Sequence, residues 1–384
     1  MTTRKTLLLT LAVIAAAPLT WPRSSRHPVE PLAHAPLESR LEALRPSATT
    51  GYEFAAFGDQ RALLDSDWPA LVDSIDRLAS RHERLLFLVD TGDIVEDGAH
   101  SDQFRVLTGL LSKIRRLPYL VAAGNHEVGQ SRPGPARANT ARFLSALDES
   151  ISPERLYYRK VAGRVRYLFL DSNDLVYRPD PRKGAQDREI ERRAHAQLDW
   201  LIRELADPAF GPSATTVVVM HHPIVQSSRK HRSQSRDLWS LRYHGRLFPE
   251  ILADGGVDLV LTGHTHTFER FTVTRRDGRG FHLVNLSGRP LPSFLWIGAS
   301  ERRAQEVHGD ATAWLYDKGW RDLDGWTIVQ EDVMVDDEED QLGLFAVDPE
   351  GGITLSLRFL GRPPGAPTRL LWGVRDSVRV GSKE

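Results

Sequence analysis

Cysteine is absent from this chain of 384 residues. Its absence excludes a disulfide framework, a metal site built on thiolates and a lipidated N-terminal cysteine. An excess of one charge is also missing, because 50 lysines and arginines nearly balance 51 aspartates and glutamates. A formal net charge of -1 gives no bulk attraction to nucleic acid or to an anionic membrane. Any recognition of phosphate must therefore be local.

Long apolar runs are missing too, apart from one short run near the N-terminus. Arg4 and Lys5 precede TLLLTLAVIAAAPLT, which ends in small residues. This layout is typical of a secretory signal, and the run is shorter than the roughly 20 residues of a spanning helix. We expect residues 1–20 to be a signal peptide and no other segment to be transmembrane. The protein is then periplasmic or extracellular, or tethered to the membrane by an uncleaved N-terminus.

The remainder of the chain alternates short apolar runs with helical patterns. Residues 21–50 are rich in proline, arginine and serine and are expected to form a linker. Beyond them, segments with apolar residues at helical spacing lie between several of the apolar runs. The runs suit buried strands and cover 52–59, 84–93, 117–127, 165–174, 215–223 and 257–266. This alternation predicts an α/β layered fold with a largely parallel sheet.

The pattern changes after residue 288. Residues 289–340 form a tryptophan-rich insertion that ends in the acidic run DDEED. We interpret the run as a solvated loop, because the ordered glycine and spacing of an EF-hand are missing. Residues 341–384 contain LGLFAVDPEGGITLSLRFL, two alternating strands joined by a turn rich in Pro and Gly. We expect this hairpin and tail to complete a core domain over 51–288.

Polar side chains stand at the ends of five of the predicted strands. These residues are Asp59, Asp93, Asn125, His126, His221, His264 and His266. Ligands of open α/β sheets gather beyond the carboxyl ends of the strands, so one crevice can receive all five segments. Each motif alone has an ordinary explanation, such as a turn or a hydrogen-bonded histidine. Their joint occurrence in this order favours a two-metal site.

The two histidines of GHTH are the strongest single signal. We expect the chain to turn after Gly263, so that His264 and His266 both reach one metal site. Oxygen ligands mixed with imidazoles suit manganese, iron or zinc. Two such divalent or trivalent ions, about 3.5–4 Å apart, form the clamp of many phosphoester hydrolases.

The series GD, GD, GNHE, HHP and GHTH resembles the calcineurin-like metallophosphoesterases, and GHTHTFER is similar to their purple acid phosphatase branch. The resemblance covers roughly residues 52–288. It implies a four-layer α/β/β/α sandwich with a dinuclear metal site at the carboxyl ends of the strands.

The resemblance also implies a role for each residue of the motifs. Asp93 would bridge the two metals, and His126 would bind phosphate and protonate the leaving oxygen. The remaining metal ligands would be Asp59 and His266 for the first ion, and Asn125, His221 and His264 for the second. Asn125 would also contact the substrate, and we leave His222 as a substrate contact or a support behind the ligands.

One ligand of the first metal departs from the family pattern. The common pattern is Asp-x-His, whereas Asp59 is followed by Gln60 and Arg61. The tyrosine of the purple acid pattern GDxxY corresponds to Glu96. A guanidinium stays protonated and offers donors only, so Arg61 cannot be a ligand. Either Glu96 or Gln60 supplies an oxygen ligand instead, or a water molecule takes the missing ligand position. We favour the water molecule.

Arg61 is expected to form a bidentate pair with phosphate oxygens of the substrate. The alternative is a structural ion pair with a nearby carboxylate. The basic segment 227–246 either lines the crevice or is a solvated insertion, and the second is the more common case.

The sequence therefore predicts a metal-dependent phosphoesterase in which a metal-bound hydroxide attacks phosphorus, with Asp93 and His126 as catalytic residues. One alternative is a phosphodiesterase or nuclease on the same scaffold, although no basic groove favours a nuclease. The other is a non-catalytic binder of a phosphorylated ligand, which the missing ligand of the first metal would suit. The sequence does not indicate an oligomeric state.

Overall fold

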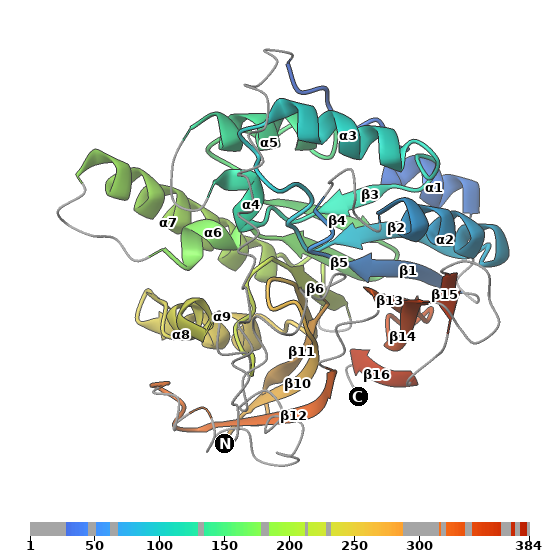
Figure 1. The fold of residues 1–384 in the computed structure, drawn as a ribbon. Coiled ribbons are helices and arrows are strands. Elements are labelled where there is room, and N and C mark those ends of the chain that lie inside the picture. The colour runs from blue at the N-terminus through green and yellow to red at the C-terminus, as the bar shows by residue number, and fades with distance from the viewer. Residues whose placement is uncertain are drawn as a thin grey trace, which may run out of the picture.

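Helices and strands build four stacked layers in this computed structural model. It describes residues 28–44, 51–61, 68–129, 134–177, 184–211, 214–227, 232–286, 315, 320–334, 340–361, 370–372 and 377–381. Within these ranges, two seven-stranded sheets pack face to face and helices cover the outer face of each (Figure 1). The four-layer α/β/β/α sandwich implied by the resemblance is confirmed.

The first sheet joins early and late parts of the chain. In spatial order its strands are β15 (Leu370–Trp372), β14 (Ile353–Gly361), β13 (Asp340–Val347), β1 (Tyr52–Phe57), β2 (Leu85–Asp90) and β3 (Tyr119–Val121), with β16 (Ser377–Gly381) beside β14. Strands β1, β2 and β3 are parallel. Strands β13 and β14 form the hairpin predicted from the sequence, and β13 pairs antiparallel with β1.

The second sheet is formed by the middle of the chain. Its strands in spatial order are β12 (Trp326–Met334), β10 (Phe268–Arg275), β11 (Gly280–Asn285), β9 (Leu259–Thr262), β6 (Thr215–Val219), β5 (Val165–Phe169) and β4 (Tyr158–Ala162). Among these described strands, neighbours are parallel only along the series β5, β6, β9 and β11. The largely parallel sheet expected from the apolar runs is therefore found in part, because antiparallel strands flank the parallel strands of each sheet. Two mixed sheets are present, because an apolar run shows that a strand is buried but not which sheet it joins.

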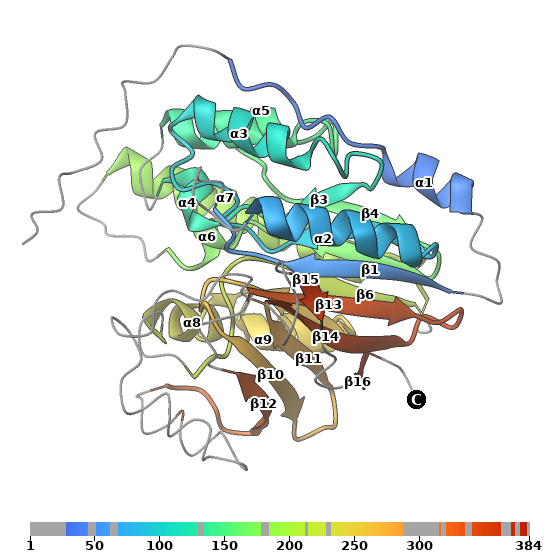
Figure 2. The ribbon, with the colours of Figure 1, turned by 45° about the vertical axis from the view of Figure 1, so that its right-hand side comes forward.

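Helices form the two outer layers (Figure 2). Those over the first sheet are α1 (Leu37–Leu44), α2 (Trp68–Arg81), α3 (Ser101–Leu111) and α5 (Pro135–Leu144); those over the second are α7 (Ala185–Leu205), α8 (Arg232–Trp239) and α9 (Phe248–Asp254). Two short helices, α4 (Asn125–Val128) and α6 (Ser172–Leu175), begin just beyond strand ends, and β7 (Arg242–Tyr243) pairs with β8 (Arg246–Leu247). None of the helices in the described ranges has both the length and the apolar character needed to span a bilayer.

The two sheets are held together by aromatic side chains in the space between them. Phe54 of the first sheet stacks on Phe87 at 5.3 Å, and Tyr167 of the second sheet meets both rings edge-on. Successive residues of a strand face opposite sides, so Val217 and Val219 join this inner core while Val218 packs under the outer helices. Burial on both faces explains the unbroken apolar runs of the sequence.

Part of the predicted linker is packed against the core. Val29, Leu32 and Leu37 are each no more than 4% exposed, and the Arg40 guanidinium donates to the carbonyl of Leu85. The proline-rich composition predicted a linker because it contains only these few apolar residues that pack on the core. The other linker residues, 21–27 and 45–50, and the predicted signal segment lie outside the described residues.

The basic segment 227–246 contains α8 and the β7–β8 pair, while 228–231 lie outside the described residues. Leu238 and Trp239 are fully buried, so this segment is not a solvated loop. Trp239 contacts Trp320 and Trp326, which belong to the described part of the tryptophan-rich insertion. Most of that insertion, with nearly all of the acidic run, lies outside the described residues.

Candidate metal centre

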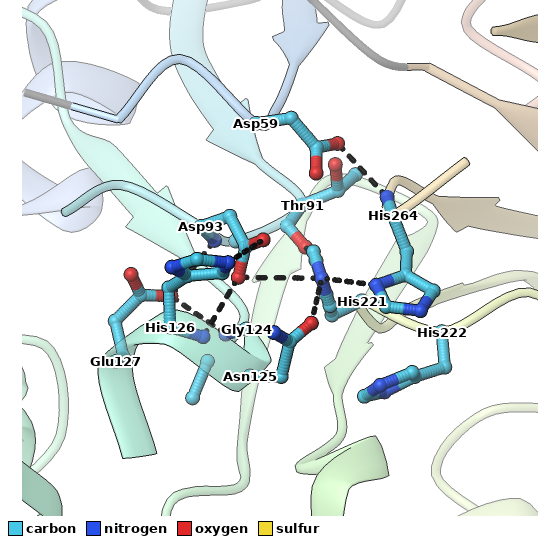
Figure 3. Close-up of polar contacts among 12 residues, drawn as sticks. Asp59, Thr91, Asp93, Gly124, Asn125, His126, Glu127, His221, His222 and His264 are labelled. Atoms are coloured by element: carbon cyan, nitrogen blue, oxygen red, sulfur yellow. Dashed lines mark hydrogen bonds and ion pairs between the residues drawn. The ribbon is translucent and has the colours of Figure 1, made fainter. Parts of the chain in front are cut away.

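Five strand ends, three from the first sheet and two from the second, meet at one edge of the sandwich (Figure 3). Each contributes polar side chains: Asp59 after β1, Asp93 after β2, Asn125 and His126 after β3, His221 after β6, and His264 and His266 after β9. The parallel strands of both sheets end at this edge, as the crevice rule for open α/β sheets requires. The structure thus brings the predicted segments together.

Four of these residues have left-handed backbone conformations. The φ angles are 62° at Asp59, 59° at Asp93, 72° at His264 and 57° at His266. Side-chain-bearing residues rarely adopt positive φ, and such strain clusters at functional sites. At His264 it turns the chain directly after Gly263, which is the condition for both histidines of GHTH to reach the site.

One compact group of lone-pair donors lies between the two sheets. The Nε2 atom of His221 is 3.3 Å from Asp93 Oδ1, 3.1 Å from Asn125 Oδ1 and 3.1 Å from His264 Nδ1. Candidate ligand atoms of Asp93, His221 and His264 lie within 4.8 Å of one another, and all three residues are buried. Ligands about 2.1 Å from one ion lie about 3.0–3.4 Å from each other in octahedral or tetrahedral geometry. The group therefore fits one metal ion.

Hydrogen bonds at the far nitrogens orient both imidazoles. His221 Nδ1 lies 2.9 Å from the carbonyl oxygen of Thr91, and His264 Nε2 lies 3.2 Å from Gln234 Oε1. Both partners are acceptors, so each far nitrogen carries the proton and donates it. The lone pairs then remain on His221 Nε2 and His264 Nδ1, the two atoms that face each other. Gln234 comes from α8, and no sequence motif indicated its position.

The loop that carries Asp93 is held by a buried glutamate. Glu127 accepts hydrogen bonds from the backbone amides of Asp93 at 2.8 Å, Val95 at 3.0 Å and Gly124 at 2.7 Å. Burial, and next the charge of Asp93, raise the pKa of Glu127 to about 7. The sequence motif GNHE contains this residue, but its role as a clamp on two loops depends on how β2 and β3 pair.

Asp93 is the most heavily contacted carboxylate of the centre. Its Oδ1 also accepts the backbone amide of His126 at 3.0 Å. Burial alone would raise the pKa of this carboxyl group, but the neighbouring His221, His126 and Arg61 outweigh burial and lower it. Asp93 is therefore an anion at neutral pH, ready to pair with a cation.

His126 lies on the opposite side of Asp93 from His221 (Figure 3). Its Nδ1 donates to the carbonyl oxygen of Glu96 at 2.6 Å, and its Nε2 lies 3.8 Å from Asp93 Oδ2. The side chain keeps 14% of its surface exposed, so the ring borders both the buried carboxylate and solvent.

Asp59 and His266, the residues that the resemblance implies for the first metal, lie next to Arg61. Asp59 Oδ1 is 3.7 Å from His266 Nε2, and Asp59 Oδ2 accepts the backbone amide of His264 at 2.9 Å. The Arg61 guanidinium lies 3.5 Å from both Asp93 Oδ2 and His266 Nε2. A guanidinium has no lone pair to offer, so this half of the centre does not fit a metal ion as it stands.

The two side chains predicted as substitutes for the missing ligand differ in their surroundings. Glu96 pairs with Arg61 Nη1 at 3.3 Å, and its second oxygen lies 3.8 Å from His126 Nδ1. Gln60 is 1% exposed, and its amide nitrogen has no hydrogen-bond partner within the described ranges.

His222 lies behind the ligand group and is 1% exposed. Its Nδ1 lies 2.9 Å from Ser172 Oγ, and its ring centroid is 4.3 Å from that of His264. Asn173, next along α6, donates to the carbonyls of Ala123 at 2.9 Å and Gly124 at 3.3 Å. Helix α6 thus supports the ends of both β3 and β6.

Comparison with known proteins gives a consistent result. Residues 56–268 match the profile of the family described as calcineurin-like phosphoesterase. Purple acid phosphatase 21 of Arabidopsis thaliana is 29% identical over 233 residues, which are 59% of this chain and 46% of that protein. Purple acid phosphatase 22 of the same plant is 27% identical over 317 residues, covering 76% of this chain and 65% of the relative.

Among solved structures, the purple acid phosphatase PPD1 of yellow lupin aligns with a TM-score of 0.49 and 16% identity, over 87% of this chain and 54% of that one. The match covers less than two thirds of the length of each of these three proteins.

Proposed function

The chain belongs to the calcineurin-like phosphoesterase family, and from that membership we propose that it hydrolyses a phosphoester with the help of bound metal. The observation that carries the proposal is the convergence of Asp93, His221 and His264 on one buried point between the two sheets. Together with Asn125, these residues place four lone-pair donors around that point. The other ring nitrogens, His221 Nδ1 and His264 Nε2, already donate to acceptors.

We propose that these four residues hold a metal ion. Asp59 and His266 lie beside them, and the resemblance implies that these two residues bind another ion, the first metal. The mixture of carboxylate, amide and imidazole supports manganese, iron or zinc. A bound ion supplies Lewis-acid chemistry, because it polarises a phosphoryl oxygen and lowers the pKa of water.

His126 is proposed as the general acid. Its Nδ1–H is fixed on the carbonyl of Glu96, so only Nε2 can exchange a proton with the substrate. Nε2 lies 3.8 Å from Asp93 Oδ2 and, in the protonated form, can deliver its proton to the leaving oxygen. The P–O bond to the leaving oxygen would break as a water oxygen bonds to phosphorus, and the proton from His126 would make the leaving group an alcohol.

Substrate binding is proposed for Asn125, which belongs to the ligand group, and for Arg61 and His126, which border it. Arg61 offers a planar pair of donors suited to two phosphate oxygens. The sequence leaves His222 as a substrate contact or a support, and its burial behind His264 favours the support.

We also propose, on the N-terminal sequence pattern alone, that residues 1–20 direct export. The core domain over 51–288 is proposed to be completed by the C-terminal hairpin, and the pairing of β13 with β1 supports this.

The proposed function is tested by metal analysis of the purified protein together with hydrolysis of an aryl phosphate monoester and an aryl diester. We expect bound metal, hydrolysis that stops on chelation, and recovery when manganese, iron or zinc is restored. Preference for the diester would identify a phosphodiesterase. Absence of both metal and hydrolysis would contradict the proposal and favour a phospho-ligand binder.

A further inference from the structure

The two oxygens of Asp93 face different partners. Oδ1 lies 3.3 Å from His221 Nε2, on the side of the compact ligand group. Oδ2 lies 3.5 Å from the Arg61 guanidinium, on the side of Asp59 and His266. A carboxylate that bridged two ions would offer one oxygen to each. Here the second oxygen already meets a positive charge supplied by the protein.

We propose that Arg61 takes the place of the first metal ion, so that the centre holds one ion, bound by Asp93, Asn125, His221 and His264. The inference rests on the proposed metal-dependent function and changes the number of ions that perform it. The positive charge beside Asp59 and His266 is then supplied by the Arg61 guanidinium and not by a metal ion.

Several contacts hold Arg61 in that position. Its backbone amide donates to the carbonyl oxygen of Asp93 at 3.0 Å, and its φ of 38° turns the chain toward the centre. Nη1 pairs with Glu96 Oε2 at 3.3 Å, while Nη2 reaches both Asp93 Oδ2 and His266 Nε2 at 3.5 Å. With its side chain 15% exposed, Arg61 is fixed by the centre at both backbone and head group.

The chemistry of the guanidinium excludes an ion at the same place. All nitrogens of a guanidinium are donors, and none offers a lone pair to a metal ion. A metal ion bound to Asp93 Oδ2 and His266 Nε2 would need the two atoms that Arg61 now contacts. It would also lie against a fixed positive charge. The guanidinium can still donate to phosphate oxygens, as an ion would attract them, but it cannot coordinate a water molecule as a metal ion does.

The inference is tested by counting ions in the purified protein by elemental mass spectrometry after saturation with Mn²⁺ and removal of excess metal. We expect one ion per chain in the wild type and in Arg61→Lys, which keeps the positive charge. Arg61→His replaces the charge with an imidazole that has a lone pair near Asp59, Asp93 and His266, and should raise the count to two. Electron paramagnetic resonance should show an isolated Mn²⁺ in the wild type and a coupled pair in Arg61→His.

Two ions in the wild type would overturn the inference and leave the proposed function intact. One ion in both the wild type and Arg61→His would show that Arg61 is not what excludes the second, and would also overturn it. No ion in the wild type would overturn the inference together with the proposed function.

Discussion

His264 Nδ1 lies 3.1 Å from His221 Nε2, although the two residues are 43 positions apart. The register of two parallel strands sets this distance, because β6 pairs with β9 and Gly263 then donates its amide to the carbonyl of His221 at 3.0 Å. The other ring nitrogens of both histidines are bonded to acceptors, so His221 Nε2 and His264 Nδ1 face each other with their lone pairs. Only a cation or a shared proton satisfies two lone pairs in this arrangement. A metal ion is the partner that also satisfies Asp93.

Replacement of Asp93 by asparagine should remove both bound metal and turnover. The substitution keeps the shape but takes away the charge that faces His221 on one side and Arg61 on the other. We expect kcat to fall by about 10³-fold, since metal Lewis acidity contributes several kcal/mol and each 1.36 kcal/mol is tenfold in rate. Asp73→Asn, at an exposed pair with Lys113, is the control and should leave metal content and kcat unchanged. Full metal content in Asp93→Asn would refute its role as a ligand.

Gln234 should set metal affinity without touching the metal. Gln234→Leu removes the acceptor that holds the proton on His264 Nε2, so the ring is no longer oriented. Loss of such a support weakens metal binding by roughly 10–100-fold. Ser233→Ala, at an exposed position of the same helix, is the matched control. Titration of the metal-free proteins with Zn²⁺ measures the difference, and equal affinities for both variants would exclude the role of Gln234.

His126→Gln should slow hydrolysis most for esters with poor leaving groups. A general acid contributes roughly 10²–10⁴-fold, and its contribution shrinks when the leaving oxygen needs no proton. We therefore expect a large fall in kcat for an alkyl phosphate and a small one for a nitrophenyl phosphate, with metal content unchanged. His82→Gln, at a pair with Glu53 away from the centre, is the control. A loss of rate that is equal for both esters would argue against proton donation by His126.

Two glycines should respond in opposite ways to alanine. A Cβ at Gly124 would overlap the backbone amide and Oδ1 of Asp93, whereas one at Gly109 in α3 meets open space. Gly124→Ala should cost about 1–3 kcal/mol of the free energy of unfolding through overpacking. Gly109→Ala should stabilise by about 0.5–1 kcal/mol because alanine favours the helix. Thermal unfolding of both variants measures the two changes, and a stable Gly124→Ala variant with normal metal content would contradict the tight packing described.

The position of the centre was predictable because parallel strands expose their carboxyl ends at one edge. Asp59, Asp93, His221 and His264 each stand at or just beyond the end of an apolar run, so the strand ends indicated where they would gather. The conformational detail was not predictable in the same way. The positive φ angles at these residues are imposed by the surrounding loops, and no preference of aspartate or histidine alone would indicate them.

Contacts between distant elements account for what the sequence left open. The position of Gln234 depends on how α8 packs over the second sheet, and that packing comes from Leu238 and Trp239 in a segment rich in charge. The contacts of Arg61 depend on His266, 205 positions away. The two-sheet division likewise depends on which strands pair, because all the apolar runs look alike when both faces of a strand are buried.

Diffraction from crystals soaked in Mn²⁺, recorded with anomalous scattering, tests the central claim most directly. We predict an anomalous peak about 2.0–2.3 Å from Asp93 Oδ1, His221 Nε2 and His264 Nδ1, enclosed between the two sheets. An empty position among those three atoms in crystals that bind Mn²⁺ elsewhere would contradict the account.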